Sequence, residues 1–226
     1  MNSGSKSLQI AVWGAVVATI LIITVAYVVK DGGRVSDSPD GVEFKHAGGA
    51  DSGSLPALFE VPDFSLTNQM GAVIGRASLL GKVWIADIIF SRCAGPCPGM
   101  TQRMADLQLA IPPQAPVSFV TLTADPLNDT PPVLLAYARR YAAQAGRWHF
   151  LTGTKRQIVD LAIGGLKLTA LDKEEAKQLD PNDLFIHSTI FVVIDRKGRA
   201  RAVIESDEPS MKLKTLAVVQ QLIDEQ

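Results

Sequence analysis

The chain has 226 residues, with 22 Lys+Arg against 23 Asp+Glu, and its formal net charge is -1. This balance excludes the strongly basic surface of a nucleic-acid-binding protein, so no nucleic-acid partner is expected. Charged residues make up 20% and apolar residues 47%, which excludes a disordered polyelectrolyte. The length suits one domain of ordinary size, and two cysteines are too few for a disulfide scaffold.

Residues 10–29 carry no charge, and their only polar side chains are Thr19, Thr24 and Tyr27. A helix of this length spans the hydrocarbon core of a bilayer. Trp13 and Tyr27 lie near its two ends, where aromatic rings favour the membrane interface. A cleaved signal peptide has a shorter apolar region followed by small residues, so the sequence favours an uncleaved transmembrane helix.

The short tail before this helix and the large domain after it predict that the N-terminus lies inside and the domain outside. Residues 1–9 form a short tail, for which we expect a cytoplasmic location. Residues 30–55 are rich in Gly, Ser and Asp without apolar periodicity, as in a flexible tether. No Arg-rich transit peptide precedes the helix, which favours a bacterial inner membrane. We therefore expect a single-pass membrane protein whose remaining domain, residues 56–226, faces the periplasm.

Alternating strand and helix signals follow in this domain. A hairpin is predicted at 64–67 and 72–74, around a Gly71 turn. Buried strands are predicted at 82–90 and 117–122 and a short strand at 148–151, with helices at 100–110, 131–145 and 154–162 between and after them. Residues 167–183 are expected to be an exposed excursion. A second hairpin, 189–194 with 199–204, and a helix at 209–224 complete the chain.

This order predicts an α/β fold with a partly parallel sheet that helices cover on both faces. Cys93 and Cys97 stand where the buried strand 82–90 turns into the next helix. The thioredoxin-like architecture places its active site at this point. We therefore expect a thioredoxin-like fold with an N-terminal hairpin, preceded by the single transmembrane helix.

The two cysteines are spaced i, i+4 at the beginning of a predicted helix. The positive end of a helix stabilises a thiolate, so the sequence predicts an acidic thiol pair. Two such thiols can chelate one soft metal ion or close into a redox-active disulfide. A purely structural disulfide would close a loop of few residues and add little stability.

A histidine completes the set of candidate ligands. No proline occurs between Pro181 and Pro209, where thioredoxins carry a cis-proline; His187 and Ser188 precede a predicted strand there instead. Two thiolates and an imidazole suit copper in a trigonal site, and zinc could use the same ligands with a water. From the spacing alone, a surface or core histidine without a ligand role is an equal alternative.

Several segments together resemble the Sco/SenC family of membrane-anchored, thioredoxin-fold copper proteins. The segments are Val83-Trp84-Ile85-Ala86-Asp87, Phe90-Ser91-Arg92-Cys93-Ala94-Gly95-Pro96-Cys97-Pro98, Asp125-Pro126 with Asp129-Thr130-Pro131, Trp148 with Leu151-Thr152-Gly153, and His187-Ser188 with Asp195 and Gly198. The resemblance runs from about Pro62 to Ile204. The three residues between the cysteines, Ala94-Gly95-Pro96, are a less common combination in that family.

The resemblance implies that Cys93, Cys97 and His187 bind copper, as Cu(I) or Cu(II). It also implies a metallochaperone that helps to assemble the copper centre of cytochrome c oxidase. The expected partners are the copper-centre subunit of the oxidase, a copper donor and thiol–disulfide partner proteins. The alternative is an enzyme, a thiol–disulfide reductase acting on the cysteines of that subunit, with Cys93 attacking and Cys97 resolving.

Two carboxylates are candidates for a supporting role behind the ligands. Asp87 lies within the buried strand, where a carboxylate is costly unless it is paired or protonated. We consider it either a residue that tunes the thiols or an aspartate bonded within the fold. Asp125 is a turn or cap former, and its loop is also placed to approach the metal.

Overall fold

The computed structural model describes residues 54–168, 170–172 and 185–225. The tail, the transmembrane helix and nearly all of the tether predicted above lie outside these residues. Among the described residues, no helix is both long enough and apolar enough to cross a membrane.

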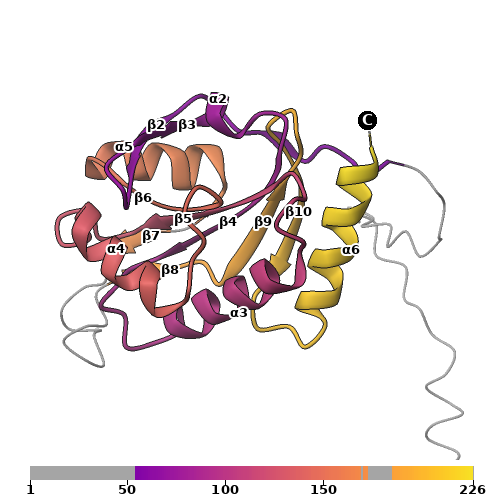
Figure 1. Ribbon diagram of the computed structural model, residues 1–226. Coiled ribbons are helices and arrows are strands. Elements are labelled where there is room, and N and C mark those ends of the chain that lie inside the picture. Colours follow the sequence, from indigo (N-terminus) through magenta and orange to yellow (C-terminus); the bar gives the residue numbers. More distant parts are fainter. Residues whose placement is uncertain (1–53, 169, 173–184, 226) are drawn as a thin grey trace, which may run out of the picture. The chain divides into compact units, whose positions relative to one another are not determined.

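The described elements follow the predicted alternation of strands and helices (Figure 1). In chain order they are β1 (Phe59–Glu60), β2 (Ser65–Asn68), β3 (Val73–Gly75), α2 (Arg76–Leu79), β4 (Val83–Ile89), α3 (Cys97–Ala110), β5 (Val117–Thr123), α4 (Pro131–Arg140), β6 (Trp148–Thr152), α5 (Lys155–Val159), the π-helical turn η1 (Asp160–Gly165), β7 (Ala170–Asp172), β8 (Phe185–His187), β9 (Ile190–Ile194), β10 (Arg199–Glu205) and α6 (Met211–Asp224).

One eight-stranded sheet organises the domain, in the order β1-β10-β9-β4-β5-β6-β2-β3. Strands β4, β5 and β6 are parallel, and β9 pairs antiparallel with β4. All residues of β4 and β5 are buried, as their continuous apolar runs predict for strands covered on both faces. In Figure 1, α3 and α6 cover one face of the sheet and α5 covers the other. The expected mixed sheet is confirmed.

The N-terminal hairpin is confirmed as β2 and β3, and the second hairpin as β9 and β10. Other boundaries differ from the predictions. Helix α4 ends at Arg140 instead of residue 145, because Ala142 adopts a left-handed backbone with φ of 50°. Helix α3 begins at Cys97, three residues earlier than predicted, because Pro96 and Pro98 suit the start of a helix.

Residues 167–183 were predicted to be an exposed excursion, and in the described part Lys167 is exposed while Leu168 is buried. Leu168 is 1% exposed, and β7 pairs antiparallel with β8 in a separate two-stranded sheet. Apolar periodicity did not reveal this hairpin, because each of its strands has only three residues. Residues 173–184 lie outside the described residues.

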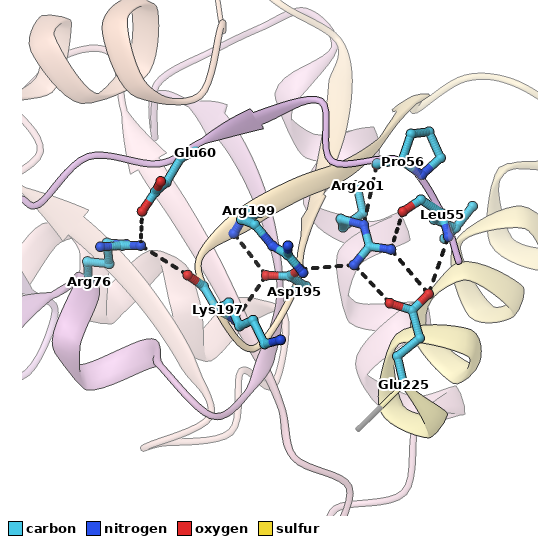
Figure 2. Close-up of polar contacts among 9 residues, drawn as sticks. All are labelled: Leu55, Pro56, Glu60, Arg76, Asp195, Lys197, Arg199, Arg201 and Glu225. Carbon is cyan, nitrogen blue, oxygen red and sulfur yellow. Dashed lines mark hydrogen bonds and ion pairs between the residues drawn. The ribbon is translucent and has the colours of Figure 1, made fainter. Parts of the chain in front are cut away.

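A buried arginine joins the two ends of the domain (Figure 2). The Arg201 side chain is 3% exposed, and it forms ion pairs with Asp195 at 3.0 Å and with Glu225 at 2.9 Å. Its guanidinium also donates to the backbone carbonyls of Leu55 and Pro56. One side chain on β10 therefore holds both the first described residues and the residue that follows α6.

Asp195 is the central acceptor of this network. Burial by itself raises the pKa of Asp195, but hydrogen bonds from the backbone and guanidinium of Arg199, from Arg201 and from the backbone of Lys197 outweigh that effect. The pKa of this carboxyl therefore lies below its usual value. Since Ile194 pairs with Trp84, the network lies beside the beginning of β4.

We predict that Arg201→Met lowers the free energy of unfolding by about 3 kcal/mol, because it removes the buried cation that Asp195 and Glu225 share, while Asp195 keeps its ion pair with Arg199. Urea unfolding followed by circular dichroism measures this loss. Arg156→Met is the matched control, because Arg156 pairs with Asp160 at the surface, where the expected loss is under about 1 kcal/mol. Equal losses in both variants would contradict the assigned role of Arg201.

Candidate functional site

The two cysteines lie beyond the carboxyl end of β4, the central strand. Cys93 is half-buried in the connection after β4, and Cys97 is the first residue of α3 and fully buried. Gly95, Pro96 and Pro98 direct the chain from the strand into the helix. This confirms the predicted position of the pair at a strand-to-helix turn.

The two thiols are in contact. The Cys97 thiol forms a hydrogen bond with Cys93, and the backbone N–H of Gly95 donates to Cys93 Sγ at 3.3 Å. On the helix side, Thr101 Oγ1 donates to the carbonyl of Cys97 at 2.9 Å. The same hydroxyl also forms a hydrogen bond with the Tyr137 hydroxyl. The pair is therefore held on both sides, and two neighbouring thiols can bind one soft ion or close into a disulfide.

The electrostatics of Cys97 differ from the prediction of an acidic pair. Burial raises the pKa of the Cys97 thiol, and the hydrogen bond and charge of Cys93 raise it further. A hydrogen bond with the backbone of Phe90 acts in the opposite direction and is outweighed. The side chain of Cys97 packs into the core, so desolvation exceeds the stabilisation that a helix N-terminus gives to a thiolate.

Asp87 lies on the strand that leads to the thiol pair. It is 0% exposed in the middle of β4, and its charge contributes to the raised pKa of Cys97. This contribution is smaller than those of burial and of Cys93.

Asp125 contacts the cysteine segment indirectly. Its carboxylate forms an ion pair with Arg92 at 2.7 Å, and Arg92 directly precedes Cys93. Asn128 donates to both oxygens of the same carboxylate at 2.9 Å. Asp125 is thus a turn former, as one of the two interpretations expected, and its side chain pairs with the residue before Cys93.

The backbone of His187 is described, and its side chain is not. His187 ends β8, and β9 begins three residues later. Because β9 runs antiparallel to β4, it begins at the sheet edge where β4 ends, which is the edge that carries the cysteines. The part of the chain with described side chains holds no group of three His, Cys, Asp or Glu residues placed to bind a metal ion.

Sequence analysis missed Ser91 and Asp129 as members of this site. Ser91 donates to the Asp129 carboxylate through both its backbone N–H and its hydroxyl. The sequence placed Asp129 among the segments that carry the family resemblance, without a role, and its side chain reaches back to the segment that follows β4. Its proximity to Asp125 in sequence, after a strand parallel to β4, was the available signal.

A thioredoxin-like domain with a dithiol at the end of its central strand is the class of protein that this fold and site define. The SCO1/SenC family model matches residues 54–223, so the chain belongs to that family.

Individual relatives agree with this assignment. The chain is 33% identical to the SCO1 protein homolog of Bacillus subtilis over 146 residues, which cover 64% of this chain and 72% of that protein. The solved structure of BsSco, a Sco-family cytochrome c oxidase assembly protein in which a disulfide switch was identified, matches with a TM-score of 0.66 at 29% identity. That match covers 78% of this chain and 100% of BsSco.

A more distant structure shows the same fold. ScoI of Bradyrhizobium japonicum with copper bound matches with a TM-score of 0.60 at 20% identity, over 72% of this chain and 99% of that one.

We predict that iodoacetamide at neutral pH modifies Cys93 at least about tenfold faster than Cys97, because Cys97 is buried and its pKa is raised. Peptide mass spectrometry of the reduced protein over a time course measures both rates. Cys97→Ser and Cys93→Ser variants give each rate in isolation. Equal rates would show that the Cys97 side chain is accessible.

Proposed function

We propose that this protein is a copper metallochaperone that assists assembly of the copper centre of cytochrome c oxidase. The observation that carries the proposal is the contacting pair Cys93 and Cys97 at the end of β4, in a chain of the SCO1/SenC family. Soft thiolate ligands suit copper, and the ScoI protein of Bradyrhizobium japonicum is known with copper bound.

The proposed ligands are Cys93, Cys97 and His187. The route of the chain supports His187, because β9 begins at the edge of the sheet that carries the cysteines. We propose that Asp87 and Asp125 influence the ligands without binding the metal. Asp87 acts through the charge it exerts on Cys97, and Asp125 acts through its ion pair with Arg92. Copper is the cargo here, and the thiols release their protons when they bind it.

A thiol–disulfide reductase is the second candidate. The unequal burial of the cysteines favours it, since half-buried Cys93 is placed to attack and buried Cys97 to resolve. The disulfide switch of BsSco shows redox chemistry in a related protein. The proposed substrate is a disulfide between the cysteines of the copper-centre oxidase subunit.

Copper titration of the reduced protein distinguishes these two functions. A chain beginning near residue 50 contains the compact unit Ser52–Gln226 and is suited to the measurement. We predict tight one-to-one binding with Cu(II)–thiolate absorption, weakened at least about tenfold in His187→Ala, since even altered neighbours of metal ligands cost that much. A dithiol reductase needs no imidazole ligand.

His149→Gln is the matched control, because His149 is a buried histidine whose side chain is hydrogen-bonded to Asn68 on β2. We expect this variant to bind copper as the wild type does. Equal, weak binding by wild type and His187→Ala would contradict the chaperone and favour thiol–disulfide exchange.

We further propose that residues 10–29 anchor the protein in a bacterial inner membrane, with residues 1–9 in the cytoplasm and the domain in the periplasm. The uncharged apolar run and the Gly- and Ser-rich segment after it support this arrangement.

We predict that the full chain stays with the membrane after alkaline carbonate washing, and that a chain beginning near residue 50 does not. In intact spheroplasts, added protease should digest the domain of the full chain. Recovery of a processed chain in the soluble fraction would instead indicate a cleaved signal peptide. Protection of the domain until lysis would reverse the proposed orientation.

A further inference from the structure

The carboxylate of Asp129 joins the ends of two neighbouring strands. Asp129 is 0% exposed and accepts the backbone N–H of Ser91 at 3.0 Å, the Ser91 hydroxyl, and the hydroxyl of Thr123. Thr123 is the last residue of β5, and Ser91 is the second residue after β4. One buried side chain therefore fixes the segment before Cys93 to the end of β5.

Neighbouring contacts hold the same segment along its length. The N–H of Ala124 donates to the carbonyl of Ile89 at 2.7 Å, which extends the pairing of β4 with β5 by one step. Arg92 is bound by Asp125, and the N–H of Cys93 donates to the carbonyl of Phe90 at 3.2 Å. The path from β4 to Cys93 is thus tied to the loop that follows β5.

We propose that Asp129 is a positioning residue for the thiol pair: it holds Ser91, and through Ser91 the Cys93 thiol, at a fixed place beside Cys97. This proposal rests on the proposed function of Cys93 and Cys97 as a joint metal and redox site. Holding two thiols in contact raises the effective concentration of each toward the other, which favours both disulfide closure and joint binding of one ion.

The chemistry of the contacts requires a carboxylate or a close mimic of it. Alanine at position 129 would leave the N–H of Ser91 without its acceptor in a partly buried place. Asparagine can keep its carbonyl oxygen toward that N–H and donate its amide to the Ser91 hydroxyl, which can turn to accept. Asp129→Asn should therefore preserve the position of the segment, and Asp129→Ala should release it.

The exchange equilibrium with glutathione measures this positioning in the full chain, purified in detergent. In the reaction, the disulfide of oxidised glutathione breaks and the Cys93–Cys97 bond forms. Two electrons and two protons pass from the protein thiols to give two reduced glutathiones. The equilibrium constant reports the effective concentration of the two protein thiols directly.

We predict that Asp129→Ala lowers this equilibrium constant about tenfold, equivalent to about 30 mV for a two-electron couple. Asp129→Asn should remain within about threefold of the wild type. The matched control is Asp195→Ala, which also removes a buried carboxylate with several hydrogen bonds, but beside the beginning of β4. It should destabilise the fold and leave the constant unchanged.

A milder pair of variants covers the case in which Asp129→Ala does not fold. Thr123→Val removes the hydroxyl that holds Asp129 to β5, and we expect about a threefold decrease. Thr121→Val is its control on the same strand, because the Thr121 hydroxyl binds Trp148 and not Asp129. Equal constants for the two threonine variants, or for Asp129→Ala and Asp195→Ala, would overturn the proposal.

Hydrogen exchange separates this inference from the proposed function. The amide of Cys93 donates to Phe90 and not to Asp129, so its protection reports the segment itself. We expect it to exchange faster in Asp129→Ala and unchanged in Asp195→Ala, whether or not the wild type closes a disulfide. Unchanged protection in both variants would overturn the positioning role. A wild type that binds no copper and forms no disulfide would overturn the proposed function instead.

Discussion

The parallel pairing of β4 with β5 is the constraint on which the site depends. Seven residues of each strand are paired in register and buried on both faces, so both strands must end at the same edge of the sheet. The cysteines leave from one strand end, and Asp125 and Asp129 leave from the other. Every hydrogen bond between these two connections follows from that pairing.

Burial is the main influence on the pKa of Cys97, and it distinguishes Cys97 from the more exposed Cys93. The Cys97 side chain belongs to the core under α3, and desolvation raises its pKa although it stands in the first turn of a helix. Such a thiol keeps its proton until a stronger partner, a metal ion or a disulfide sulfur, replaces it. Cys93 is the more exposed member of the pair, and under the proposed function it meets that partner first.

The long buried strands and the helices between them were predictable, because their apolar runs exceed what a loop would carry. The position of Cys93 and Cys97 followed from the break that Gly95, Pro96 and Pro98 introduce after β4. The raised pKa of Cys97 was not predicted, because the predicted helix began at residue 100. In the longer α3, Cys97 lies three and seven residues before buried Met100 and Met104, on the side that faces the core. The contact of Asp129 with Ser91 was not predicted either, because it depends on the parallel pairing of β4 with β5, which brings the two strand ends together. Strands β7 and β8 are too short to leave a periodic signal.

The Arg201 network has a mechanical consequence. The chain enters the domain at Leu55 and Pro56, where that guanidinium links it to β10 and to the end of α6. A force applied to the chain before Leu55 would therefore be carried by β10 and α6, beside the beginning of β4. The cysteines lie past the other end of that strand, about 23 Å away for seven extended residues. Such a force would therefore act at the end of β4 opposite the dithiol.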